Sequence, residues 1–182
     1  AQEGDGWITV RSQIDLAKQD MDLLKNTLQQ HNRKPSNILK TVFSYGCVLS
    51  ENEPYDSPRA LAQAGPQVAS LFHRLVEGSL QISLPTNVNK SLSAYRQIYD
   101  NYIPHSTRYL ENHTGHLLFL RSDEKPFITA DAVKQLTFTG PFQEMVDRIR
   151  YLETCGYDQW VINIPPGQDE ALESWARVIE KV

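Results

Sequence analysis

The feature that most constrains this chain is its alternation between strand-like and helix-like segments. The expected order is a strand at 7–10, an amphipathic helix, a second strand at 38–49, several helices, a third strand at 159–164 and a last helix. Such alternation is typical of right-handed βαβ units, which place parallel strands side by side and cover them with helices. We therefore predict an α/β fold built on a parallel sheet.

The second predicted strand carries apolar residues on both of its faces. Val42, Phe43, Tyr45, Val48 and Leu49 fall at both odd and even positions of the segment. A strand that is apolar on both sides is expected in a sheet buried beneath helices.

The domain organisation follows from length and regularity. We expect one domain over 1–182, with a mainly helical insertion at 54–126, where the pattern is least regular. Within it, Ser57 and Pro58 begin a helix that Gly65 and Pro66 are expected to interrupt. An eight-fold (β/α) barrel typically needs about 250 residues, so the 182 residues here are expected to form part of a larger barrel, or half of an assembly that completes one.

A tyrosine-rich helix is predicted at 89–102. Tyr95, Tyr99 and Tyr102 share a broad face with Leu92 and Ile98. This face either packs inward with its hydroxyls reaching water, or covers an opening or a partner surface.

Composition excludes several classes of partner. Lys and Arg total 18 against 22 Asp and Glu, a net charge of −4, which gives no electrostatic reason to expect nucleic acid or an anionic membrane. No apolar run approaches the roughly 18 residues of a membrane span. Cys47 and Cys155 do not make a disulfide scaffold and are expected in the core, so a cytoplasmic location is predicted.

The motif His113-x-x-His116 is the main candidate for chemistry. Two imidazoles could bind one metal ion, but no Cys, His or carboxylate at matching spacing completes a site, so we expect no metal. Two roles are therefore open for these histidines. They contact a substrate or cofactor, or they make structural hydrogen bonds. The chain carries no Walker loop, Rossmann fingerprint or G-x-S-x-G motif.

Several segments together carry a resemblance to a known family. They are 1–8, which includes Asp5-Gly6-Trp7-Ile8; 32–35; 109–117, which includes the two histidines; and 139–166, a helix ending at Cys155-Gly156 and a closing strand. These stretches resemble the C-terminal part of the luciferase-like flavin-dependent oxidoreductases, the group of bacterial luciferase-type monooxygenases and F420-dependent reductases.

The resemblance implies the C-terminal portion of a (β/α)8 barrel that binds FMN or F420 at its rim. The reaction would be hydride transfer or oxygen activation on a small organic substrate. Arg11, just past the first strand, would bind a phosphate or substrate anion or simply lie on the surface, while His113 and His116 would line the mouth as hydrogen-bond donors or a proton relay. Much of the cofactor phosphate site would lie before residue 1, in a missing N-terminal half. The alternative is a non-catalytic fragment or subunit that completes a barrel, or a homo-oligomer, with another chain.

Overall fold

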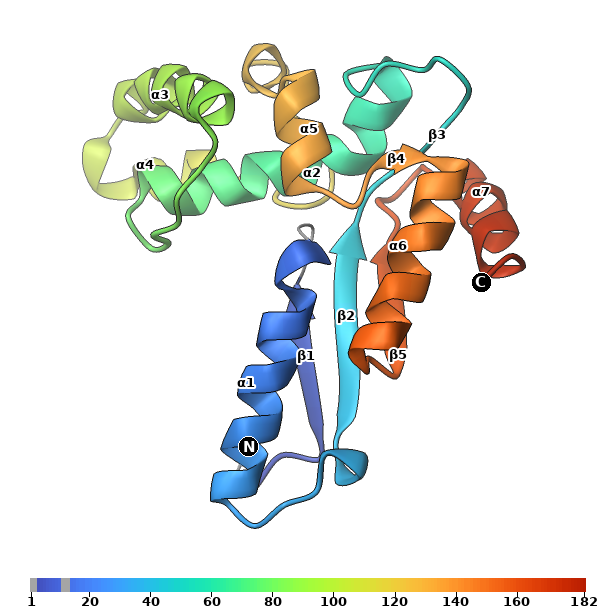
Figure 1. Ribbon diagram of the computed structural model, residues 1–182. Helices are drawn as coiled ribbons and strands as arrows, with labels where there is room; N and C mark the ends of the chain where they lie inside the picture. Colours follow the sequence, from blue (N-terminus) through green and yellow to red (C-terminus); the bar gives the residue numbers. More distant parts are fainter. Residues whose placement is uncertain (1–2, 11–13) are drawn as a thin grey trace.

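The computed structural model describes residues 3–10 and 14–182. Its centre is a three-stranded parallel sheet in the order β1-β2-β5, with a short parallel pair, β3 and β4, continuing from one end (Figure 1). Val10 of β1 pairs with Phe43 of β2, which pairs in turn with Val161 of β5. The predicted α/β fold with parallel strands is confirmed. The strands are β1 Gly6–Val10, β2 Leu39–Tyr45, β3 Val48–Leu49, β4 Gly140–Pro141 and β5 Gln159–Asn163.

Two groups of helices complete the structure. Within the described residues, short 3₁₀ segments occur at Ile14–Leu16, Pro35–Asn37, His105–Thr107 and Lys125–Phe127. The helices are α1 Ala17–Gln30, α2 Pro58–Val76, α3 Thr86–Asn101, α4 Arg108–Asn112, α5 Ala130–Leu136, α6 Phe142–Cys155 and α7 Glu170–Ile179. None of the helices in the described ranges is long and apolar enough to cross a membrane.

The first core lies between the sheet and helices α1, α6 and α7. The apolar stripe of α1, with Met21 and Leu28 fully buried, meets Val42 of β2 and Leu152 of α6. The spacing of the α1 residues follows the helical period, so one face of the helix enters the core and the other meets water. This core covers one face of the sheet.

The second core lies in a helical layer formed by α2, α3 and α5. Phe72 of α2, Tyr95 of α3 and Val133 of α5 are fully buried in it. Figure 1 shows this layer lying across the carboxyl ends of β1 and β2. The predicted insertion at 54–126 contains α2, α3 and α4, and the division of the chain into one domain with this insertion stays a prediction.

The structure corrects two local expectations. Helix α2 runs from Pro58 to Val76 without a break at Gly65 and Pro66, because Ala64 and Val68 on either side are fully buried and their packing offsets the hydrogen bond that a proline removes. The strand predicted at 38–49 is divided into β2 and β3 at Gly46, where the backbone passes close to Phe138.

Candidate functional site

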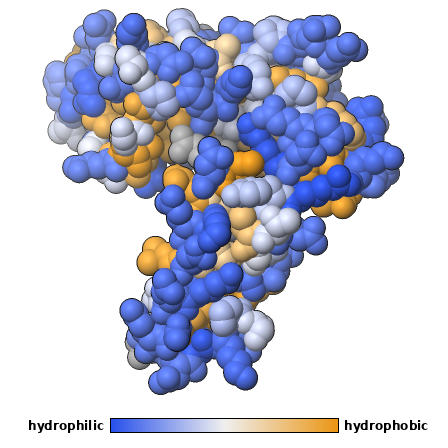
Figure 2. Space-filling model, in the orientation of Figure 1, coloured by the Kyte–Doolittle hydropathy of each residue, from blue (hydrophilic) through white to orange (hydrophobic). Residues whose placement is uncertain are grey.

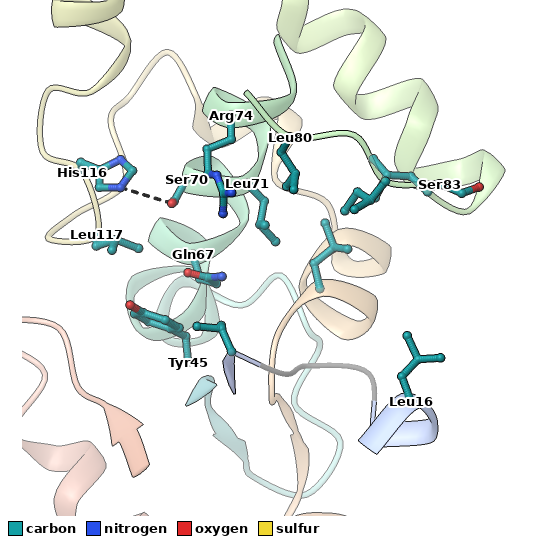
Figure 3. Close-up of a pocket in the computed structure, with 14 residues that line it drawn as sticks. Leu16, Tyr45, Gln67, Ser70, Leu71, Arg74, Leu80, Ser83, His116 and Leu117 are labelled. Atoms are coloured by element: carbon teal, nitrogen blue, oxygen red, sulfur yellow. Dashed lines mark hydrogen bonds between the residues drawn. The ribbon is translucent and has the colours of Figure 1, made fainter. Parts of the chain in front are cut away.

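A cavity of about 670 Å³ lies where the carboxyl ends of β1 and β2 meet α2 (Figure 3). Val10 and Tyr45, the last residues of these two strands, line it. This volume is within the usual range for a small-molecule site. In parallel α/β folds, ligands bind at the carboxyl ends of the strands, so the cavity lies where a substrate or cofactor is expected.

One face of α2 supplies the polar wall of this cavity. Gln67, Ser70, Leu71 and Arg74 recur at spacings of three and four, which places them on one side of the helix. The opposite wall is mostly apolar and comes from β1, the residues before α1, the segment after α2, the turn after α4 and the end of α5: Val10, Leu16, Leu80, Ile82, Ser83, Leu84, Leu117 and Leu136.

Two polar side chains of this wall have no protein partner. Among the described residues, no hydrogen bond or ion pair is made by the amide of Gln67 or the guanidinium of Arg74. Gln67 is only 8% exposed and its amide points toward the cavity (Figure 3). Because the amide of Gln67 faces the open cavity, it offers a ligand there both hydrogen-bond donors and an acceptor.

His116, one of the two histidines predicted to line the mouth of a site, is among the residues that line this cavity, and its role in binding or chemistry stays a prediction. Its Nε2 atom lies 3.3 Å from Oγ of Ser70. Burial lowers the pKa of His116, and the nearby His113 and His73 lower it further. These effects favour the neutral imidazole, which offers one donor and one acceptor.

His113 lies behind His116 and is not among the residues that line the cavity. Its Nδ1 atom is 3.0 Å from Nδ1 of His116, and its Nε2 atom is 3.1 Å from both carboxylate oxygens of Glu77. The structure therefore brings the two predicted histidines together but places only one at the cavity. Arg11, the third predicted site residue, lies outside the described residues, and its role stays a prediction.

The third histidine of this cluster was not among the predicted site residues. His73, on α2, has its Nδ1 atom 3.3 Å from Nδ1 of His116. The available signal was a polar stripe on an otherwise apolar helix, since Ser70, His73 and Glu77 recur at spacings of three and four. His73 is 43 positions from His116, so spacing along the chain could not join it to the motif.

The second face of the sheet is left open by the described helices. Ile8 and Val10 of β1 and Leu39 of β2 are 62%, 55% and 51% exposed. Exposed apolar residues on a sheet face of this kind are expected to be covered by other parts of a protein. On the opposite side of the molecule, which Figure 2 shows, apolar residues gather beneath the helical layer.

No family model matches this chain, and no curated protein matches it. Solved structures that share its fold include two F420-dependent enzymes. The F420-dependent tetrahydromethanopterin reductase from Methanopyrus kandleri superposes with a TM-score of 0.53 at 12% identity, covering 95% of this chain and 44% of the reductase. An F420-dependent secondary alcohol dehydrogenase, solved with an F420–acetone adduct, superposes with a TM-score of 0.53 at 14% identity, covering 100% of this chain and 44% of the dehydrogenase.

These likenesses confirm the fold that the sequence resemblance implied. Both neighbours are F420-dependent enzymes, a reductase and an alcohol dehydrogenase, and the described strands and helices share their fold. The chain spans less than half the length of either neighbour.

Proposed function

We propose that the protein containing this chain is an F420- or FMN-dependent oxidoreductase acting on a small organic substrate. The observation that carries the proposal is the position of the cavity. It lies at the carboxyl ends of β1 and β2, in a fold shared with two F420-dependent enzymes. Parallel strands that end at a common rim bring residues from distant segments to one ligand, which is why this rim carries activity in such folds.

The residues around the cavity fit a flavin or deazaflavin in chemistry. Val10, Leu71 and Leu136 offer an apolar surface for a flat ring, and Gln67 offers an unpaired amide for its polar edge. Arg74 offers an unpaired guanidinium for a phosphate or carboxylate. The ring, when bound, supplies the centre that accepts or donates hydride.

The protein groups would orient the substrate and exclude water. Ser70 and His116 form one hydrogen-bonded pair at the cavity wall, so Ser70 is held in position to hydrogen-bond a hydroxyl or carbonyl oxygen. In this assignment His116 is a hydrogen-bonding residue of the site. His113 supports His116 from behind and acts through it.

A binding titration tests the proposal. The intact protein that carries this chain is titrated with F420 and separately with FMN, with absorbance and fluorescence as readouts. The loaded protein is then mixed with a secondary alcohol, and reduction of the cofactor is followed. We expect saturable binding of one of the two cofactors and a change in its absorbance on adding a substrate.

Matched arginine variants make this test specific. Arg74→Gln should raise the Kd for the anionic cofactor about tenfold or more, because a charge-assisted contact is lost. Arg177→Gln removes an exposed arginine of α7, far along the chain, and should leave the Kd unchanged. Absence of binding by the unaltered protein, or equal Kd values for the two variants, would contradict the proposal.

The open face of the sheet favours a second candidate. Here the chain is a non-catalytic fragment or subunit that completes a barrel with other strands, or dimerises with a second copy. Ile8, Val10 and Leu39 would then be buried by the added strands. Under this alternative the purified protein shows no flavin absorbance after excess FMN or F420, and replacing Leu39 with Lys shifts its oligomeric state.

A further inference from the structure

The three histidines of the cluster converge through the same ring atom. Nδ1 of His116 lies 3.0 Å from Nδ1 of His113 and 3.3 Å from Nδ1 of His73. The ligand atoms of all three lie within 4.8 Å of one another. Two nitrogen ligands at 2.0–2.1 Å from a tetrahedral Zn²⁺ ion stand about 3.3 Å apart. The spacing of these nitrogens is therefore close to that of ligands sharing one ion.

The hydrogen bonds made by the Nε2 atoms of His73 and His113 determine which ring nitrogens carry hydrogens and which carry lone pairs. Nε2 of His73 lies 2.7 Å from Oε1 of Glu124, and Nε2 of His113 lies 3.1 Å from the carboxylate of Glu77. An ionised carboxylate only accepts hydrogen bonds, so these Nε2 atoms carry the hydrogens. In the neutral rings, Nδ1 of His73 and of His113 then present lone pairs toward Nδ1 of His116.

His116 alone cannot satisfy both of these lone pairs. Its Nδ1 atom carries at most one hydrogen, and two acceptors face it at 3.0 and 3.3 Å. Its Nε2 atom is already placed against Ser70. A cation bound by the three Nδ1 atoms removes the repulsion between their lone pairs. Each Nε2 atom then remains hydrogen-bonded to Ser70, Glu124 or Glu77.

The carboxylates that hold the rings are themselves fixed. Glu124 is 1% exposed and accepts a hydrogen bond from the Tyr95 hydroxyl at 2.8 Å. Glu77 accepts a hydrogen bond of 2.7 Å from Nδ2 of Asn112, a residue that is fully buried. Histidine ligands of metals usually donate their second N–H to a carboxylate or another fixed acceptor, which sets the tautomer and the ring orientation. This outer arrangement is present for His73 and His113, and Ser70 offers a hydroxyl oxygen to His116.

We propose that His73, His113 and His116 bind a divalent transition-metal ion of the Zn²⁺ class through their Nδ1 atoms. Imidazole ligands suit zinc, copper, iron and nickel and do not suit Mg²⁺ or Ca²⁺. The carboxylate of Glu77 partly balances the charge of the ion, whereas Glu124 already pairs with Nη2 of Arg121 at 3.1 Å. The ion connects α2 to the segment after α4 and holds His116 at the wall of the cavity. This inference does not depend on the proposed oxidoreductase function, since it rests on the positions of the three imidazole rings, although His116 also lines the cavity.

Zinc titration of the metal-stripped protein tests the site. The intact protein, without a histidine tag, is dialysed against chelator and then titrated with Zn²⁺ in competition with a chromophoric chelator. Co²⁺ is used in a parallel sample, because its visible absorption reports the coordination geometry. We expect one ion per chain, a visible Co²⁺ spectrum typical of tetrahedral nitrogen ligands, and a rise in Tm on binding.

Variants identify the ligands. His113→Ala should weaken Zn²⁺ binding by at least about 100-fold, whereas His105→Ala, which removes an exposed histidine outside the cluster, should leave it unchanged. Glu77→Gln keeps the shape of the side chain and should weaken binding by about 10- to 100-fold, so this variant tests the site even if His113→Ala does not fold. No zinc binding by the unaltered protein, or equal binding by His113→Ala, Glu77→Gln and His105→Ala, overturns the proposal.

Discussion

Nε2 of His73 lies 2.7 Å from Oε1 of Glu124, and the two side chains are 2% and 1% exposed. The same oxygen accepts the Tyr95 hydroxyl at 2.8 Å, and the second oxygen accepts the backbone N–H of Arg121 at 3.1 Å. One buried carboxylate therefore joins α2, α3 and the segment before α5. It acts as a polar connection inside the otherwise apolar helical layer.

Removing this carboxylate should destabilise the helical layer. In Glu124→Ala, the buried donors of His73 and Tyr95 lose their acceptor, and we expect a loss of about 3 kcal/mol in the free energy of unfolding. Asp123→Ala removes an adjacent carboxylate whose side chain is 45% exposed and should cost less than about 1 kcal/mol. Urea unfolding of the two variants measures the difference, and equal losses would contradict the role given to Glu124.

Gly46 should tolerate no side chain. An ideal Cβ at this position would lie 1.9 Å from the carbonyl oxygen of Phe138, while hydrogen bonds from Phe138 N–H to Tyr45 and from Gly140 N–H to Cys47 hold the two backbones together. Gly46→Ala should therefore cost about 2 kcal/mol or more, because the short β3–β4 pairing must open.

Gly4 provides the matched control for Gly46, because a Cβ there meets nothing closer than 3.5 Å. Thermal unfolding of Gly4→Ala should resemble that of the unaltered protein. A Gly46→Ala variant that unfolds at the same temperature as Gly4→Ala would show that the close approach of the two backbones is not required.

The pair between Glu53 and Arg59 should make stability fall in acid. Burial by itself would raise the pKa of the Glu53 carboxyl, but hydrogen bonds from Arg59, Ser57 and the backbone N–H of Ser50 outweigh it and lower the pKa from 4.5 to about 2. A carboxyl with a lowered pKa stabilises the folded state above its unfolded pKa. This contribution is lost as the pH falls from about 4.5 toward 2.

Water around the pair screens its interaction, so we expect it to contribute on the order of 1 kcal/mol to the free energy of unfolding. Denaturant unfolding at several pH values measures it. Glu53→Gln should flatten the decline between pH 4.5 and 2, whereas Glu51→Gln, at an exposed position, should not. An unchanged pH profile in Glu53→Gln would sink this assignment.

The two cysteines should differ in reactivity. Cys47 is fully buried, and burial raises the pKa of its thiol to about 12, a rise that the nearby Arg59 only partly opposes. At pH 8 its thiolate fraction is roughly one part in 10⁴, so a disulfide reagent should react with Cys47 only on unfolding. Cys155 is only partly buried and should react first.

Single replacements assign the two thiols. Cys155→Ser should remove the fast phase of labelling in the native protein, and Cys47→Ser should leave that phase intact. Fast labelling of a Cys155→Ser variant under native conditions would mean that Cys47 is accessible.

The sequence by itself determined the three strands of the main sheet and their parallel arrangement, but not the short β3–β4 pair. Thr129, a residue type that favours helix N-caps, caps α5, and its side chain accepts the N–H of Ala132. Gly156 was predicted to end the next helix and has φ of +101°. These features depend on residues within a few positions of one another, where periodicity, capping and left-handed backbone conformations are local properties.

Local rules failed where distant packing decided the outcome. Gly65 and Pro66 signal a break, but the helix continues because both flanks are buried against other segments. The tyrosine-rich face of 89–102 left two interpretations open, and the structure places Tyr95 and Tyr99 inside the helical layer. In both cases the outcome was decided by packing between segments that are distant in the sequence, which local sequence rules do not describe.

The candidate site needed the tertiary structure most of all. The sequence placed His113 and His116 together, since three positions separate them, and gave no means of adding His73 or Glu124. His73 lies 40 to 51 positions before His113, His116 and Glu124, and only the packing of α2 against the segment after α4 brings its ring nitrogens to within about 3 Å of His116 and Glu124. The pair His113 and His116 follows from their closeness in the sequence. The cluster with His73 forms only because α2 packs against the segment after α4.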